Sequence, residues 1–328
     1  AEIQELLAYD EDTAGGLMAK ELVKVYETWT VAGCLRRIRG QAQHVSRVHS
    51  IYVVDKQEKL LGRLSLKDLL TAKSDQKIAE LANSNVDYVY VEEDVEEVAK
   101  IMQKYDLEAI PVVDQNKTLL GRITIDDIVD VIREEADKDY QMAAGISQDV
   151  EADDSILKLT KARLPWLLIG MFGGLGAASI IEGFNGSMGE FIILLSFVPL
   201  IQATAGNVGV QSSAIVVQGL ANNSIDGNII KRLFKESILG LVNGLALALV
   251  AIAVTHFAFK TPYIISITIA IALVAVIIMA ALIGTFIPIF LDKRGIDPAV
   301  ATGPFITTSN DVFGILLYFL IAKSILGF

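Results

Sequence analysis

Asp311 is an acidic residue in the middle of an apolar segment. It lies about twelve residues into the stretch 299–322, roughly 18 Å along the axis if this stretch is helical. A carboxylate at such a depth in a membrane costs several kcal/mol unless it faces water, protein or a cation. Asp311 therefore indicates a cation pathway, and a buried structural hydrogen bond is the alternative.

Polar residues and glycines in two apolar segments could share this chemistry. Thr307 and Asn310 come just before the acid, and the stretch 206–213 reads G-N-V-G-V-Q-S-S. Asn207 and Gln211 are four residues apart, so on a helix they lie on one face. Such segments are tolerated inside a membrane only where they line a cavity or pack against protein. For the glycines alone, close packing of helices is the other explanation.

A second set of acidic residues lies in the first half of the chain. Residues 1–163 hold 32 Asp and Glu against 21 Lys and Arg and so carry the whole net charge of −11, whereas residues 164–328 hold seven of each. In the stretch 126–154, eleven acidic residues face only two basic ones. A divalent cation would relieve the repulsion between such carboxylates, whose oxygen atoms suit Mg²⁺ or Ca²⁺. A solvated face that keeps the domain soluble is the alternative.

Composition argues against several other functions. The acidic balance disfavours nucleic acid as a partner, because neutralising phosphates needs clustered Lys and Arg. The single cysteine, Cys34, excludes an internal disulfide and a cysteine-rich zinc site. The sequence contains no phosphate loop, nucleophile elbow or zinc motif. We therefore predict that the protein is not an enzyme.

The acidic half contains an internal repeat with an offset of 59 residues. The segment from Ser50 reads S-I-Y-V-V-D-K-Q-E-K-L-L-G-R-L-S-L-K-D-L-L, and the segment from Ala109 reads A-I-P-V-V-D-Q-N-K-T-L-L-G-R-I-T-I-D-D-I-V. Each copy predicts a short strand, a turn at an aspartate, a second strand and a helix. Helical patterns at 30–40 and 94–105 precede the copies. This half is therefore predicted to be α/β.

The second half predicts five membrane-spanning helices, since each needs about 20 apolar residues. Eight basic residues flank the spans on the side of the N-terminal half, against Lys260 and Lys323 on the other. By the positive-inside bias the N-terminal half is expected in the cytoplasm and, with an odd number of spans, the C-terminus outside. Pro199, Pro288 and Pro304 are expected to kink helices. The predicted spans are 164–184, 190–218, 237–259, 263–290 and 299–322.

Both copies of the repeat carry the pattern G-x-x-[ST]-x-x-D. With this pattern the repeat is similar to a tandem pair of CBS (cystathionine-beta-synthase) domains, a regulatory module. In such modules the hydroxyl and the carboxylate of the pattern often hold the ribose of an adenine nucleotide such as ATP. The resemblance therefore implies a nucleotide site, and helix capping by the same side chains is the alternative. The residues are Ser65, Asp68, Thr124 and Asp127.

Four motifs follow one another along the chain. They are the opening Y-D-E-D-T-A-G-G-L-M from Tyr9, the CBS pair, the segment G-N-x-G-x-Q-S, and D-P-A-x-x-x-x-P-x-x-T-x-x-x-D from Asp297 to Asp311. Together they make the chain resemble the MgtE family of magnesium channels and transporters. In that family the protein is a homodimer whose pore runs along the dimer axis, lined by the second and fifth spans. The resemblance implies a pore site for hydrated Mg²⁺ at Asp311, Asn207, Gly206, Gln211, Thr307 and Asn310.

The resemblance also implies regulation by the transported ion. The family closes when cytosolic Mg²⁺ rises, because ions bind between acidic surfaces of the CBS dimer and the following connecting helix. We expect a Mg²⁺ channel that imports Mg²⁺ across the cytoplasmic (bacterial inner) membrane and serves magnesium homeostasis. An ion-coupled secondary carrier of divalent cations and a nucleotide-regulated membrane protein are the alternatives. The implied regulatory residues are Asp94, Glu96, Asp106, Asp127, Asp130, Glu135, Asp139 and Asp297.

The predicted fold is an α/β cytoplasmic CBS-domain pair followed by an all-α transmembrane bundle of five helices. Family members usually carry a further helical domain ahead of the Tyr9 motif, so gating is expected to depend on the CBS pair and the connecting helix. Membrane lipid and a second copy of the chain are the expected partners. The expected parts are a linker remnant at 1–18, CBS domains at 19–75 and 76–132, the connecting helix at 133–160, and the membrane domain at 161–328.

Overall fold

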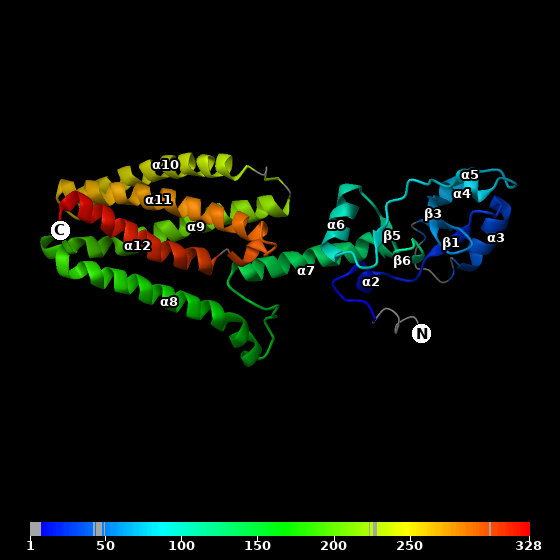
Figure 1. Ribbon diagram of the computed structural model, residues 1–328, viewed down its shortest axis with the longest axis horizontal. Helices are drawn as coiled ribbons and strands as arrows, with labels where there is room; N and C mark the ends of the chain where they lie inside the picture. The colour runs from blue at the N-terminus through cyan, green and yellow to red at the C-terminus, as the bar shows by residue number, and fades with distance from the viewer. Residues whose placement is uncertain are drawn as a thin grey trace. The chain divides into compact units, whose positions relative to one another are not determined.

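The structure of the chain is a computed structural model, drawn in Figure 1. It describes residues 8–41, 43, 48, 50–222, 224–225, 228–301 and 303–328. By its internal contacts the chain divides into two compact units, Ala1–Ala136 and Asp137–Phe328. The first unit is α/β and the second is helical.

The N-terminal unit contains two three-stranded sheets with the same topology. In each sheet the first strand pairs in parallel with the second, and the second pairs antiparallel with the third. Parallel neighbours cannot be joined by a tight hairpin, so a helix makes the connection between them. The strands are β1 (Val23–Tyr26), β2 (Ile51–Val54), β3 (Leu60–Leu64), β4 (Val89–Tyr90), β5 (Ala109–Val113) and β6 (Leu119–Thr124), and the connecting helices are α3 (Val31–Gln41) and α6 (Val95–Lys104).

The structure confirms the repeat, including its turns. Asp55 Oδ1 accepts hydrogen bonds from two backbone N–H groups at 2.8 and 2.9 Å, and Asp114 Oδ1 accepts two at 2.8 and 2.7 Å. Glu58 and Lys117 follow these aspartates at equivalent positions, and both have a φ of 64°. Aspartate side chains stabilise turns by bonding their own following backbone. The two copies therefore fold one sequence pattern into the same turn.

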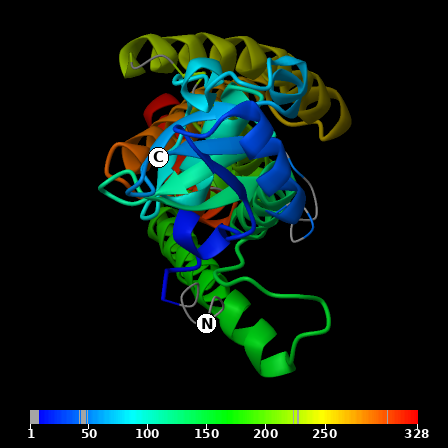
Figure 2. The same ribbon diagram turned by 90° about the vertical axis from the view of Figure 1, so that its right-hand side faces the viewer.

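Each sheet packs against its own helices. Ile51 and Leu69 are fully buried in the core of the first copy, and Met102 and Ile110 are fully buried in that of the second. Figure 2 shows the strands in the middle of this unit, with the blue helix α3 beside them. The other helices that begin in this unit are α2 (Ala14–Leu17), α4 (Leu66–Thr71), α5 (Ile78–Leu81) and α7 (Ile125–Ala143).

The C-terminal unit contains five long apolar helices among its described residues. Four helical runs are long and apolar enough to cross a membrane, and the first of them, Ile156–Ala221, holds two helices. Gly189, with a φ of 49°, begins a 3₁₀ segment that separates these two, and they run in opposite directions in Figure 1. The fold class is therefore as predicted. The helices are α8 (Ile156–Met188), α9 (Val198–Ala221), α10 (Ile229–Ala253), α11 (Tyr263–Asp292) and α12 (Pro304–Leu326).

Two of the three prolines expected to kink helices begin them instead, and the expectation was wrong there. Pro199 lies in the first turn of α9 and Pro304 in the first turn of α12. The first turn of a helix has no intrahelical partner for its N–H groups, so proline loses no hydrogen bond in that position. Pro288 does lie inside a helix, α11.

The segment expected as a connecting helix is not one continuous helix. Helix α7 ends at Ala143, residues 144–155 are not helical, and α8 begins at Ile156. Ser155 caps the start of α8, since its Oγ accepts a hydrogen bond from the Lys158 N–H at 3.4 Å. The helix that enters the bundle therefore starts before the apolar stretch that predicted it.

Helix α11 packs against α9, α10 and α12. Its approach to α9 is close, because a Cβ atom on Gly284 would lie 2.3 Å from the carbonyl oxygen of Gly209. A Cβ atom on Gly209 would in turn lie 1.9 Å from Asn310 Nδ2 of α12. Helix α9 is thus held between two neighbours at separations that only glycine permits.

Gly284→Ala is expected to destabilise the bundle by about 1–3 kcal/mol, because a backbone atom occupies the space of the added methyl group. Gly174→Ala in α8 is the matched control, since no atom lies within 4 Å of the Cβ position there. Thermal unfolding of the detergent-solubilised protein measures both variants. Equal melting temperatures for the two would contradict this packing.

Candidate functional site

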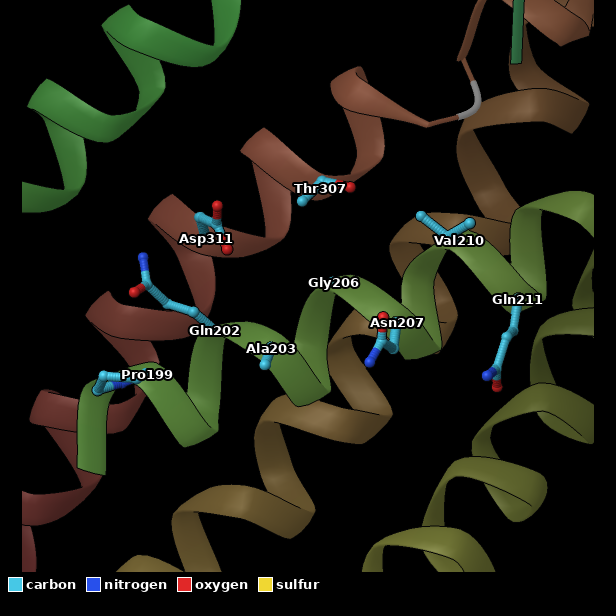
Figure 3. Close-up of a pocket in the computed structure, with 9 residues that line it drawn as sticks. All are labelled: Pro199, Gln202, Ala203, Gly206, Asn207, Val210, Gln211, Thr307 and Asp311. Carbon is cyan, nitrogen blue, oxygen red and sulfur yellow. The ribbon is translucent and has the colours of Figure 1, made fainter. Parts of the chain in front are cut away.

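A cavity of about 640 Å³ lies between α9 and α12 and contains Asp311. Figure 3 shows Asp311 and Thr307 on α12, and Gln202 on α9, extending into the space between the two helices. The lining is therefore made by two helices that are about a hundred residues apart in sequence. The lining residues are Pro199, Gln202, Ala203, Gly206, Asn207, Val210, Gln211, Thr307 and Asp311.

One face of α9 forms most of the cavity, because its lining residues recur at spacings of three and four. Gly206 lies close to α12, since a Cβ atom there would lie 3.3 Å from Thr307 Cγ2. Asn207 and Gln211 are exposed in the single chain. Their amide groups are therefore accessible to a ligand or to another chain at this face.

The carboxylate of Asp311 is half-buried and forms no hydrogen bond or ion pair with any residue that the structure describes. The side-chain amides of Gln202, Asn207 and Gln211 likewise form no hydrogen bond within the described part of the chain. One carboxylate and several amide oxygens are the ligand types that Mg²⁺ prefers, directly or through its waters. The arrangement can therefore bind a hydrated divalent cation.

Five of the six predicted pore residues line this cavity, and Asn310 does not. Asn310 is fully buried, and its Nδ2 donates a hydrogen bond to the carbonyl oxygen of Ala205 at 3.4 Å. Adjacent residues of a helix point about 100° apart, and here Asp311 lines the cavity whereas Asn310 is directed at the backbone of α9. Asn310 instead joins α12 to α9.

Four of the lining residues were not among the predicted pore residues, namely Pro199, Gln202, Ala203 and Val210. Gln202 is the polar one among them. It lies four residues before Gly206, so the spacing that placed Asn207 and Gln211 on one face could have found it as well. Its side chain extends into the space between α9 and α12 in Figure 3.

The eight acidic residues of the expected sensor do not form a compact metal site within one chain. In the described ranges, no group of three or more His, Cys, Asp or Glu side chains could hold a metal ion. Asp94 caps α6, because its Oδ1 accepts a hydrogen bond from the Glu96 N–H at 2.8 Å. Asp297 is exposed, and its Oδ1 accepts one from the Ala299 N–H at 2.8 Å.

The other acids of this set lie on or beside the same helices. Asp127 caps α7, since its Oδ2 accepts hydrogen bonds from Thr124 Oγ1 at 2.6 Å and from the Thr124 N–H at 3.2 Å. Asp130 and Asp139 are exposed on α7, and Asp106 follows α6 with a φ of 49°. Asp127 is therefore engaged in local structure, whereas Asp130 is open to solvent.

Glu96 of α6 and Glu135 of α7 interact across the two helices. Burial raises the pKa of Glu96 above its ordinary value of 4.5, and the negative charges of Glu135 and Asp94 raise it further. The pair therefore repels when both carboxylates are ionised. A divalent cation at this place would offset that repulsion.

Glu96→Gln is expected to raise the melting temperature of the metal-free protein at neutral pH. A raised folded-state pKa means that the folded protein binds the proton more tightly, so this stabilising contribution is present below pH 4.5 and is lost as pH rises through the raised pKa. The charged carboxylate thus opposes folding at neutral pH. Thermal unfolding with and without Mg²⁺ measures this effect, and a lower melting temperature for the variant would contradict it.

A further cavity of about 440 Å³ in the N-terminal unit contains Ser65 and Asp68, two of the four expected nucleotide residues. Ser65 Oγ accepts a hydrogen bond from the Asp68 N–H at 3.0 Å and donates one to Asp68 Oδ2 at 2.6 Å. Both residues thus cap α4 and also line the cavity. Arg63 lines the cavity as well, and its guanidinium suits phosphate. Thr124 and Asp127 do not line this cavity.

Known proteins match both units of the chain. The family model of MgtE, a divalent cation transporter, matches residues 198–321, and the CBS-domain model matches residues 14–75 and 78–134. The magnesium transporter MgtE of Enterococcus faecalis is 40% identical over 324 residues, which cover 98% of this chain and 71% of that protein. This chain belongs to the MgtE family. The family is one of transporters and not of enzymes.

A second relative agrees with this assignment to the MgtE family. The magnesium transporter MgtE of Bacillus subtilis is 34% identical over 323 residues, which cover 98% of this chain and 71% of that protein. Among solved structures, the cytosolic domain of the Mg²⁺ channel MgtE in complex with ATP is 45% identical, with a TM-score of 0.39, and the match covers 40% of this chain and 52% of that one.

Proposed function

We propose that this member of the MgtE family is a Mg²⁺-selective channel in which Asp311 holds the hydrated ion. The observation that supports this most is the Asp311 carboxylate in a cavity of amide side chains, without a partner among the described residues. Mg²⁺ sheds its tightly held waters reluctantly. Carboxylate and amide oxygens can bind the ion through those waters, so selection would depend on hydrated size and charge.

The proposal includes a homodimer with the pore on its axis. Asn207 and Gln211 are exposed beside the cavity in one chain, so the cavity has a side that a second copy could cover. A symmetric copy would add a second Asp311, and two carboxylates would balance the charge of one divalent ion. Sedimentation of the detergent-solubilised protein should give twice the chain mass, and a monomer that still conducts would exclude this arrangement.

We further propose that the N-terminal half lies in the cytoplasm and closes the channel when Mg²⁺ binds to it. The excess of basic residues on that side of the spans supports the orientation. The repulsion between Glu96 and Glu135 supports the sensor, because a bound cation would change the free energy of this region. A single chain gathers too few acids for a tight site in the described ranges, so a second copy would supply further ligands.

The cavity at Ser65 and Asp68 supports a regulatory site for ATP or another adenine nucleotide. Three acidic residues line it, and one of them, Asp68, suits a ribose, whereas Arg63 suits a phosphate group. Ligand-dependent thermal stabilisation of the protein by ATP, lost in Asp68→Ala, would test this role. Equal stabilisation of both proteins would place the nucleotide elsewhere.

Electrical recording in planar bilayers tests the channel proposal against an ion-coupled carrier. A channel gives stepwise Mg²⁺ currents far above the turnover of a carrier, whereas a carrier gives small fluxes that follow a coupling-ion gradient. Currents that vanish without a proton or Na⁺ gradient would contradict the channel. Flux with no measurable single-channel step would also favour the carrier.

A further inference from the structure

A second cavity of the helical unit, of about 460 Å³, lies beside the first half of α10 and is basic. Lys231, Arg232 and Lys235 provide three positive charges, and Glu236 is the one acidic residue of α10. Such a cavity attracts an anion. The lining residues are Ser224, Ile225, Asn228, Lys231, Arg232, Phe234, Lys235 and Ile238.

The basic groups differ in how they are held. Arg232 Nη2 lies 3.2 Å from Glu236 Oε1, and Glu236 is buried and accepts a hydrogen bond from Ser212 Oγ of α9 at 3.3 Å. The Nε atom of Arg232 is buried and has no hydrogen-bond partner among the described residues. Lys231 and Lys235 are exposed, and no described acidic side chain pairs with either. The cavity thus combines one anchored guanidinium with two available ammonium groups.

An apolar face of α10 continues from these lysines. Lys231, Lys235, Ile238, Val242 and Leu249 recur at spacings that keep them on one side of the helix, and the last three are 48%, 59% and 70% exposed. Eleven residues separate Ile238 from Leu249, or roughly 16 Å along the axis. This length matches one leaflet, about half of the ~30 Å hydrocarbon core.

We propose that this cavity binds the phosphate group of an anionic phospholipid, whose acyl chains lie along the exposed face of α10. The two ammonium groups and the guanidinium bind the phosphate oxygens, and the apolar face covers the chains. A soluble phosphate compound would leave that face without an occupant. A second copy of α10 would bring further lysines, and the one acidic residue of this helix, Glu236, is buried. The charges of a second copy would therefore not complement the basic cavity.

Binding of fluorescent phosphatidylglycerol to the detergent-solubilised full chain tests the site, with unlabelled phosphatidylglycerol, phosphatidylcholine and glycerol phosphate as competitors. Phosphatidylglycerol should compete, and the other two should not. Lys231→Gln/Lys235→Gln should weaken binding about fivefold for each lysine removed. Fluorescence anisotropy gives the affinities, and unchanged elution on size exclusion confirms that the variant is folded.

Lys293→Gln/Arg294→Gln is the matched control, because both residues follow α11 on the same predicted side of the membrane and do not line the cavity. It should change the affinity less than about twofold, since charges beyond the screening length contribute little. Equal weakening in both double variants would show general surface charge in place of a site. Competition by glycerol phosphate as strong as by phosphatidylglycerol would show a soluble phosphate site and overturn the lipid proposal.

Discussion

Asp311→Asn is expected to lower Mg²⁺ flux about 10- to 100-fold, because it removes the charge from the one acidic group that lines the α9–α12 cavity in the described chain. Asparagine keeps the size and the polarity of the side chain. A lower flux would therefore result from the missing negative charge and not from a change of packing. Uptake of Mg²⁺ into liposomes, followed with an internal Mg²⁺ dye, measures the flux.

Two further variants make this test specific. Asp311→Glu retains the carboxylate and should keep more flux than Asp311→Asn. Glu182→Gln also removes one negative charge from the helical unit, but from an exposed position on α8 outside the cavity, and should leave the flux near that of the native protein. Unimpaired flux in Asp311→Asn would remove Asp311 from the ion pathway. A similar loss in Glu182→Gln would indicate that the net charge of the domain is responsible.

Glu96→Gln/Glu135→Gln is expected to keep conducting at internal Mg²⁺ concentrations that close the native channel. The two carboxylates repel each other when ionised, and Mg²⁺ gains binding free energy by relieving that repulsion. Glutamine has nearly the same shape as glutamate but no charge. Mg²⁺ would therefore no longer bind the closed state more tightly than the open state. Patch recording at varied internal Mg²⁺ gives the concentration that halves the current.

Glu97→Gln/Glu134→Gln is the control for this prediction, since it removes the same charge from the same two helices. Glu97 pairs with Lys100 at 2.7 Å, and Glu134 is exposed on α7. The halving concentration of this control should stay near the native value. If internal Mg²⁺ closed both double variants at the native concentration, Glu96 and Glu135 would not belong to the sensor.

Several elements of the fold could be predicted because their signals are local. The repeat with an offset of 59 residues predicted two equivalent sheets, since a strand, a turn at an aspartate and a second strand are encoded within about twenty residues. The apolar stretches predicted the long helices because hydropathy is also a local signal, but they did not predict where these helices begin and end. Helix ends depend on caps such as Ser155 and on first-turn prolines such as Pro304, which hydropathy does not detect.

The candidate site could be predicted only in part. A helix face follows from spacing, so Asn207 and Gln211 were found together, and Gln202 could have been. Asn310 was included because it is next to Asp311 in sequence, yet it points toward Ala205. The capping role of Asp127 was one of two interpretations that its pattern allowed, and the bond to Thr124 established that role.

The sequence by itself determined that an acidic α/β repeat precedes a set of apolar helices and that one carboxylate lies deep within the last of them. These features follow from composition, periodicity and hydropathy, which need no knowledge of distant contacts. Only the tertiary structure decided that α9 and α12 enclose Asp311 with Gln202, and that Glu96 approaches Glu135. Both juxtapositions depend on how helices distant in sequence pack, and glycines such as Gly206 and Gly209 set that distance for α9.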